Sequence, residues 1–212
     1  MFPLFFRVCP PVTTCSSHQI QACLDAGLLS DVIELLLSNS DEDEMLQCAC
    51  ALTNALNGGS VLQVCRLVTH TPSVLTALNV VLASSNQALL WLAPQTLQRV
   101  MQAGDAIRDG GLDAETAAIV AALCPSGQHP FTARVAATCM RHLHAVASSD
   151  KIGQHISSTA NHILKTWWSE AEVKEAIEAQ RIQEQMQAAA SASSSSPAPV
   201  SPLRVDSLAP DA

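Results

Sequence analysis

The sequence predicts an all-α protein, an α-solenoid of about three helical repeats with extra carboxy-terminal helices. Three observations support this: the composition, one apolar stripe that recurs in three long segments, and a shorter apolar segment ahead of each. Of the 212 residues, 48% are hydrophobic, yet only four are Phe, three are Trp and none is Tyr. This composition favours helices packed on helices over a β-sandwich, which prefers aromatic and β-branched residues.

The recurring stripe places apolar or small residues at i, +3, +4, +7, +10 and +11. It fits residues 45–56, 90–101 and 136–147, whose first residues lie 45 and 46 positions apart. Units of two or three helices with a period of about 40–47 residues are typical of armadillo or HEAT solenoids. One such unit cannot bury its stripe alone, so stacked units share a continuous core. A compact α-bundle is the alternative that the pattern leaves open.

The shorter helices are expected at residues 19–24, 28–37, 61–68, 74–82 and 114–123. Gly58 with Gly59, and Gly104, are expected to end the first two long helices, because glycine commonly follows a helix. Pro94 lies inside the second long helix, where it removes a backbone donor. We therefore expect a kink there, or a helix that begins late.

Two more helices follow the repeats. Residues 151–168 carry one apolar face, and Ser169 with Glu172 forms the sequence of a capping box that begins a last helix to about Ala190. The expected organisation is an irregular segment at 1–16, armadillo-like repeats at 17–147, carboxy-terminal helices at 148–190 and a disordered Ser/Ala/Pro-rich tail at 191–212.

Composition also limits the function. The net charge is −8, which argues against nucleic acid or an anionic membrane as partner and allows a basic one. The eight cysteines form no CxxC pair, so we expect reduced thiols and a location in the cytoplasm and nucleus. No apolar run is long enough to cross a membrane. No nucleotide-binding or hydrolase motif occurs, and no metal site with convincing spacing. We expect no enzyme activity and no cofactor.

The segment from Gln19 to Gly27, followed by Val32 to Leu36, resembles the armadillo repeats of importin alpha. The stretch from Cys50 through Asn54 to Gly59 is similar to that family's tryptophan-x-x-x-asparagine helix. Residues 63–68 and 77–82 continue in the family's order. By that order, the chain resembles the last three or four repeats of the family, over roughly residues 17–147.

The resemblance implies an adaptor that binds nuclear localisation peptides for protein import into the nucleus. In that family the long helices line a groove, where asparagine bonds the peptide backbone, tryptophan holds lysine stems and acidic residues take the ammonium. The residues that this places at the groove are Glu44, Gln47, Cys50, Asn54, Gln95 and Arg99. In the third repeat the equivalent positions are Arg141 and Ala145.

The chain also departs from the family's pattern. Cys50 stands where the family has tryptophan, Arg99 and Arg141 would repel a basic peptide, and Trp91 lies one turn outside this register. The Lys/Arg-rich segment that recruits importin beta in the family is absent, so we do not expect this chain alone to recruit it. Cys50→Trp is expected to strengthen peptide binding.

Two other functions stay open: a helical protein–protein interaction scaffold without nuclear-signal binding, and a regulatory or enzyme-accessory α-bundle. The acidic run Asp41–Glu44 has two interpretations as well. It is a binding spot for lysines of a basic partner, or a solvated first helical turn with Ser40 as its cap.

Overall fold

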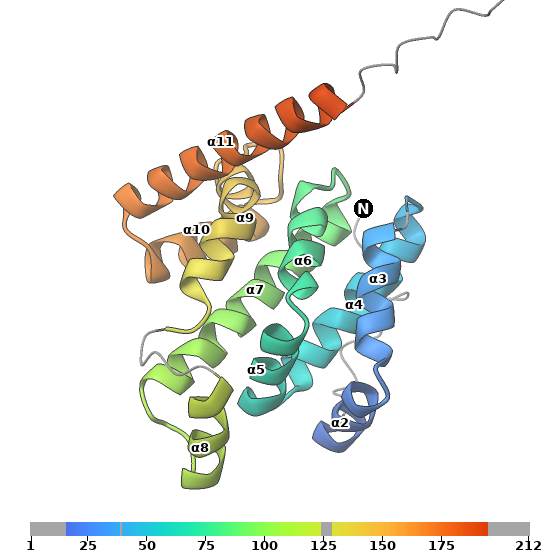
Figure 1. Ribbon diagram of the computed structural model, residues 1–212, viewed down its shortest axis with the longest axis vertical. Helices are drawn as coiled ribbons and strands as arrows, with labels where there is room; N and C mark the ends of the chain where they lie inside the picture. The colour runs from blue at the N-terminus through green and yellow to red at the C-terminus, as the bar shows by residue number, and fades with distance from the viewer. Residues whose placement is uncertain (1–15, 39, 124–128, 195–212) are drawn as a thin grey trace, which may run out of the picture. The chain divides into compact units, whose positions relative to one another are not determined.

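The computed structural model describes residues 16–38, 40–123 and 129–194, and every regular element in these ranges is an α-helix (Figure 1). The chain divides into two compact units, one ending at Gln180 and the other beginning at Arg181, within the last helix. The predictions for residues 1–15 and for the tail beyond Ser194 lie outside the described residues. The helices are α2 Ser17–Asp25, α3 Leu28–Ser38, α4 Glu42–Gly58, α5 Val61–His70, α6 Ser73–Ala83, α7 Gln87–Arg108, α8 Ala114–Leu123, α9 Thr132–Ala147, α10 Gln154–Trp167 and α11 Glu170–Ser194.

The packing of the first unit repeats every three helices. Each helix from α2 to α7 contacts the helix three positions further along the chain. Three rows result: α2, α5 and α8; α3, α6 and α9; and α4, α7 and α10 (Figure 1). Neighbouring rows also touch, since α3 packs on α4, α6 on α7 and α9 on α10.

In each row, at least one side chain forms a hydrogen bond to the neighbouring helix of the same row. The Gln63 amide donates to the Ser17 carbonyl at 2.8 Å and joins α5 to α2. The hydroxyl oxygens of Thr53 and Thr96 lie 2.9 Å apart and join α4 to α7. His142 Nδ1 lies 2.9 Å from Asn79 Oδ1 and joins α9 to α6. These bonds help to set the register of helices that also share the hydrophobic core.

The predicted stripe is buried in all three long segments. Leu52, Leu97 and Leu143 each have 0% of their surface exposed, and all belong to one hydrophobic core. The expected alignment of the third segment is nevertheless wrong. Residues 136–147 lie in α9, which stands in the row of α6, whereas α10 stands beside α7. Periodicity could not separate these two helices, because α9 and α10 each carry an apolar stripe of helical spacing.

Helix ends follow the sequence in some places and depart from it in others. Ser169 and Glu172 make the expected capping box, in which the Ser169 backbone N–H donates to Glu172 Oε2 at 2.7 Å. Asp41, not Ser40, caps α4, since its carboxylate accepts from the backbone N–H groups of Asp43 and Glu44. A carboxylate at this position also complements the helix dipole.

The second long helix excludes one of the two alternatives expected at Pro94 and contradicts the end expected at Gly104. Helix α7 begins seven residues before Pro94 and continues past it, so it does not start late. Gly104 does not end α7, which runs to Arg108. A Cβ built on Gly104 would lie 2.3 Å from Cε1 of the His129 ring. The glycine is therefore explained by the close approach of another side chain and not by a helix terminus.

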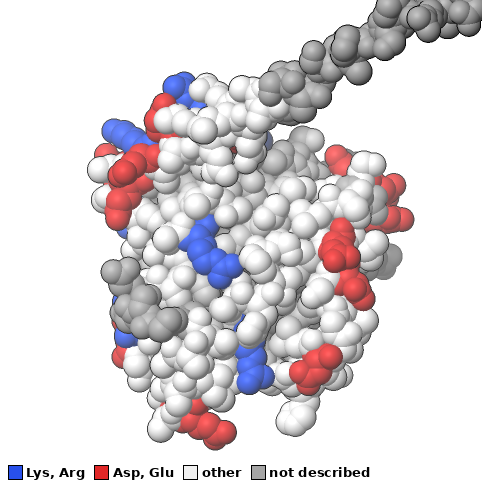
Figure 2. Space-filling view, in the orientation of Figure 1, with Lys and Arg blue, Asp and Glu red and all other residues white. Residues whose placement is uncertain are grey.

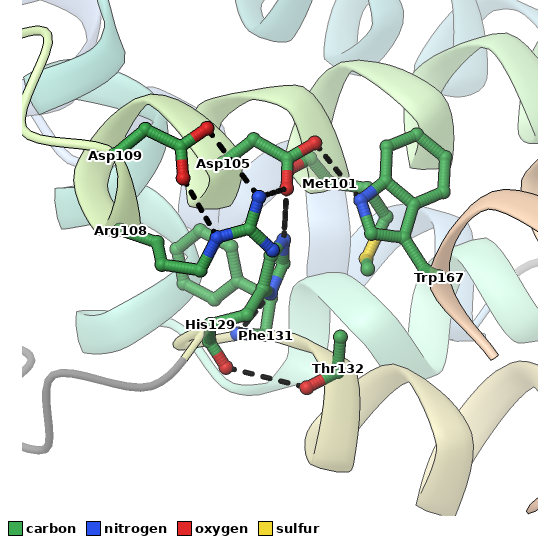
Figure 3. A network of polar contacts seen from close by, with 8 residues as sticks. All are labelled: Met101, Asp105, Arg108, Asp109, His129, Phe131, Thr132 and Trp167. Atoms are coloured by element: carbon green, nitrogen blue, oxygen red, sulfur yellow. Dashed lines mark hydrogen bonds and ion pairs between the residues drawn. The ribbon is translucent and has the colours of Figure 1, made fainter.

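His129 belongs to a polar network that ties the end of α7 to the start of α9 and the end of α10 (Figure 3). Its Nδ1 accepts from the Phe131 backbone N–H at 3.3 Å, so the ring proton sits on Nε2, which donates to the Met101 carbonyl at 2.9 Å. Asp105 accepts from the Trp167 indole at 2.9 Å and pairs with Arg108. The hydrogen bonds and ion pairs of this network join α7, the segment that leads into α9, and α10.

Candidate functional site

The row of α4, α7 and α10 carries a polar hollow of about 470 Å³. Most of its lining comes from one partly exposed stripe of α7. Trp91, Gln95, Gln98 and Gln102 follow one another at spacings of four, three and four residues, so their side chains lie on one face of the helix. The remaining lining residues are Asn57 of α4, Arg99 of α7, and His155 and Thr159 of α10.

Side-chain amides dominate this surface and have no partner within the part of the chain that the structure describes. Asn57, Gln95, Gln98 and Gln102 make no side-chain hydrogen bond there. Each amide offers two N–H donors and one carbonyl acceptor, the groups that pair with a peptide backbone. Four unpaired amides around one hollow can therefore bond an extended chain at several successive residues.

Trp91 gives the hollow an aromatic wall. Its surface is 45% exposed, which makes it one of the few large hydrophobic side chains left open in the described residues. An exposed indole beside unpaired amides suits recognition of another chain, because tryptophan combines a large apolar face with one hydrogen-bond donor.

The predicted groove residues are not all brought together. Gln95 and Arg99 line the hollow. Asn54 is half-buried on α4, one turn before the lining residue Asn57, and therefore lies on the same face of the helix. Glu44 and Gln47 are exposed nearer the beginning of α4, outside the lining. Arg141 lies on α9, in the row of α6, so it does not follow Arg99 as expected.

Cys50 was expected to face the groove and does not. Only 8% of its surface is exposed, and it packs in the hydrophobic core. The expectation that Cys50→Trp strengthens binding is therefore unfounded, because an indole there would overpack the core and cost about 1–3 kcal/mol or more.

Trp91 was set aside in the sequence as one turn outside the register, and Asn57 and the α10 residues were not identified. Trp91 and Gln95 are four residues apart, the spacing of Cys50 and Asn54, so shifting the register by one turn would have found the pair. His155 and Thr159 were missed because α9, and not α10, was assigned to the third repeat.

Charge is distributed unevenly in the first unit. Between residues 17 and 65, covering α2 to α4 and half of α5, there are seven Asp or Glu and no Lys or Arg. Figure 2 shows carboxylates gathered along the edge of the molecule where α2 and α3 lie. Two of them have local roles: Asp41 caps α4, and Glu42 accepts from the Asn86 amide at 3.0 Å. This part of the chain is electrostatically suited to a basic partner.

Cys139 and His142 stand three residues apart on α9, a spacing that could supply two metal ligands, but both side chains make packing contacts. Cys139 is fully buried, its thiol donates to the Leu75 carbonyl, and burial raises the pKa of this thiol to about 12. His142 Nδ1 lies 2.9 Å from Asn79 Oδ1 on α6. A thiol whose pKa is raised by burial stays protonated near neutral pH, which disfavours Cys139 as a nucleophile.

No known family model matches this sequence, and no curated protein matches it at a significant level. Among the described residues, no helix is both long and apolar enough to span a bilayer.

Proposed function

We propose that this chain is an armadillo-type solenoid that binds an extended protein segment along the row of α4, α7 and α10. The kind of segment implied by the resemblance is a nuclear localisation peptide, and the role is that of an importin-alpha-like adaptor in nuclear import. The observation that carries the proposal is the stripe of unpaired amides on α7, beside an exposed indole.

The packing order supports the solenoid. Within the first compact unit there are three repeats of three helices: α2 to α4, α5 to α7 and α8 to α10. Each repeat contributes one helix to each row. In such an array every row forms one continuous surface across the repeats. The hollow takes its lining from all three helices of one row.

The charge of α2 to α4 supports a basic segment. A chain whose amides lie in the hollow would extend toward the start of α4, where Asp43 and Glu44 are exposed. Exposed ion pairs of this kind contribute about 0–1 kcal/mol each and weaken as salt rises. We therefore expect weak, salt-sensitive binding of a lysine-rich peptide.

Fluorescence anisotropy of a labelled lysine-rich peptide, titrated with the full chain, tests this function. Gln95→Ala and Asn54→Ala should each weaken binding, and Trp91→Ala should weaken it more, because the indole supplies the largest apolar contact. Gln154→Ala is the matched control, since this exposed glutamine begins α10 outside the hollow. Binding that responds equally to all four substitutions, or to none, contradicts the proposed site.

The second candidate is a helical scaffold without nuclear-signal binding. Arg99 in the hollow favours it, because a guanidinium there repels the lysines of a localisation peptide. In the anisotropy experiment the scaffold predicts no binding of the lysine-rich peptide at low salt.

A further inference from the structure

The hollow is locally basic, although the chain as a whole is acidic. Arg99 and His155 line it, and none of its lining residues is Asp or Glu. The net charge of the chain is −8, so this local composition is opposite to that of the rest of the molecule.

Arg99 is a half-buried cation without a carboxylate. One of its terminal nitrogens donates to the Gly59 carbonyl at 2.8 Å, at the end of α4. It makes no ion pair within the described residues. Burial lowers the pKa of the Arg99 guanidinium from its usual value, as expected for a charge that has lost water. A guanidinium has five N–H donors, so one carbonyl leaves most of them for a ligand.

Removing a charge from water without a counter-ion costs stability, so buried charges in proteins are usually paired. Here the cation sits in an open hollow, surrounded by amide donors that are themselves unpaired. We propose that the hollow receives an acidic residue of the bound protein segment, with Arg99 as the counter-ion of its carboxylate. This inference rests on the proposed function, since the acidic residue belongs to the protein segment that the proposed function places in the hollow.

A protein segment fits this charge pattern better than a polyanion does. A nucleic acid would bring many phosphates toward the seven carboxylates carried by residues 17–65. A peptide can place one carboxylate at Arg99 and positive charges elsewhere. Trp91 in the same hollow offers an apolar wall to the residues that flank the carboxylate.

The length of α4 sets the distance between the acidic and the basic positions of the bound segment. Glu44 lies near its beginning, and Gly59, which Arg99 contacts, caps its end. Fifteen residues of α-helix span about 22 Å at 1.5 Å per residue. An extended chain covers that length in about seven residues at about 3.3 Å each. The segment is therefore bipolar, with its acidic residue about seven positions from its basic cluster.

Three peptides of equal length test the inference by anisotropy with the full chain. The first carries a lysine cluster and a Glu about seven residues away. It is synthesised in two versions, one with the Glu before the lysines and one with the Glu after them. The second replaces that Glu by Gln, and the third moves the Glu next to the lysines. We expect the first to bind about fivefold more tightly than the second in at least one order, and more tightly than the third. Arg99→Gln should remove that advantage, Arg99→Lys should keep part of it, and Lys174→Gln on α11 should leave it intact.

The outcomes separate the two proposals. If the lysine peptides bind, but the Glu and Gln versions bind equally, the function stands and the acidic-residue inference is wrong. If the Glu advantage persists in Arg99→Gln, the carboxylate binds elsewhere and the inference is also wrong. If no peptide binds, both are wrong. Arg99→Gln also removes the bond to Gly59, so it can change the affinity for every peptide. The deciding quantity on each variant is therefore the ratio of the affinities for the Glu and Gln peptides.

Discussion

Gly104→Ala offers a sharp test of the packing around α7, because two effects of opposite sign compete. Alanine is favoured over glycine in a helix interior by about 1 kcal/mol, so propensity alone predicts a more stable protein. The new Cβ, however, would lie 2.3 Å from Cε1 and 2.5 Å from Nε2 of His129. Non-bonded contacts of a Cβ atom are essentially never shorter than 3.0 Å, so the ring must move.

The cost of that movement can be estimated from the contacts of His129. Displacing the ring breaks the 2.9 Å hydrogen bond to the Met101 carbonyl, worth about 1 kcal/mol, and leaves that carbonyl without its side-chain donor. Overpacking adds about 1–3 kcal/mol. After subtracting the propensity gain, we expect Gly104→Ala to lower the free energy of unfolding by about 1–3 kcal/mol.

Urea unfolding followed by circular dichroism measures this change, and His129→Ala supplies the control. With the ring removed, Gly104→Ala has only the propensity gain and should stabilise the protein by about 0.5–1 kcal/mol relative to His129→Ala alone. If Gly104→Ala changes the free energy of unfolding in the same direction with and without His129, the reasoning is wrong. It is also wrong if Gly104→Ala alone stabilises the protein.

Three other predictions concern the core and the helix ends. Leu52→Ala should lower the free energy of unfolding by about 2–5 kcal/mol, because the side chain is fully buried; a loss below half of that speaks against a core position. Thr96 donates to the Leu92 carbonyl at 2.9 Å, so Thr53 must donate to Thr96. Thr96→Val therefore leaves a buried donor unpaired and should destabilise by about 1–3 kcal/mol, more than Thr53→Val; equal losses would contradict this order. Hydrogen bonds from Ser169 hold the pKa of Glu172 below its usual range, so the capping stabilisation is present above the usual glutamate pKa and is lost as pH falls through the lowered value. An NMR titration of Glu172 should show that lowered pKa, and Ser169→Ala should raise it.

Much of the fold could be predicted, because the apolar stripe and its helix breakers depend on local sequence. Leu52, Leu97 and Leu143 are buried as the stripe predicts, and Ser169 with Glu172 caps α11 as their spacing predicts. The assignment of α9 to the row of α4 and α7 failed, since a stripe shows that a helix has a buried face but not which helix covers it. That choice depends on contacts between residues far apart in sequence.

The candidate site could be predicted only in part. Gln95 and Arg99 were placed at the groove from the resemblance, and both line the hollow. Cys50 was placed there too, but a cysteine fits a core as well as a surface, and tertiary packing decides between them. The role of Gly104 was invisible in the sequence, because His129 approaches it from 25 residues away.

The central claim is that the unpaired amides of α7 bond an extended segment. The most direct measurement is the NMR signal of the side-chain amide groups of Gln95, Gln98 and Gln102, followed while the full chain is titrated with the bipolar lysine–glutamate peptide. These amide signals should shift together with the Trp91 indole signal, at one common dissociation constant, while the signal of the Gln154 amide stays in place. A peptide that binds and shifts other residues, leaving the α7 amides and the indole unchanged, would contradict the central claim.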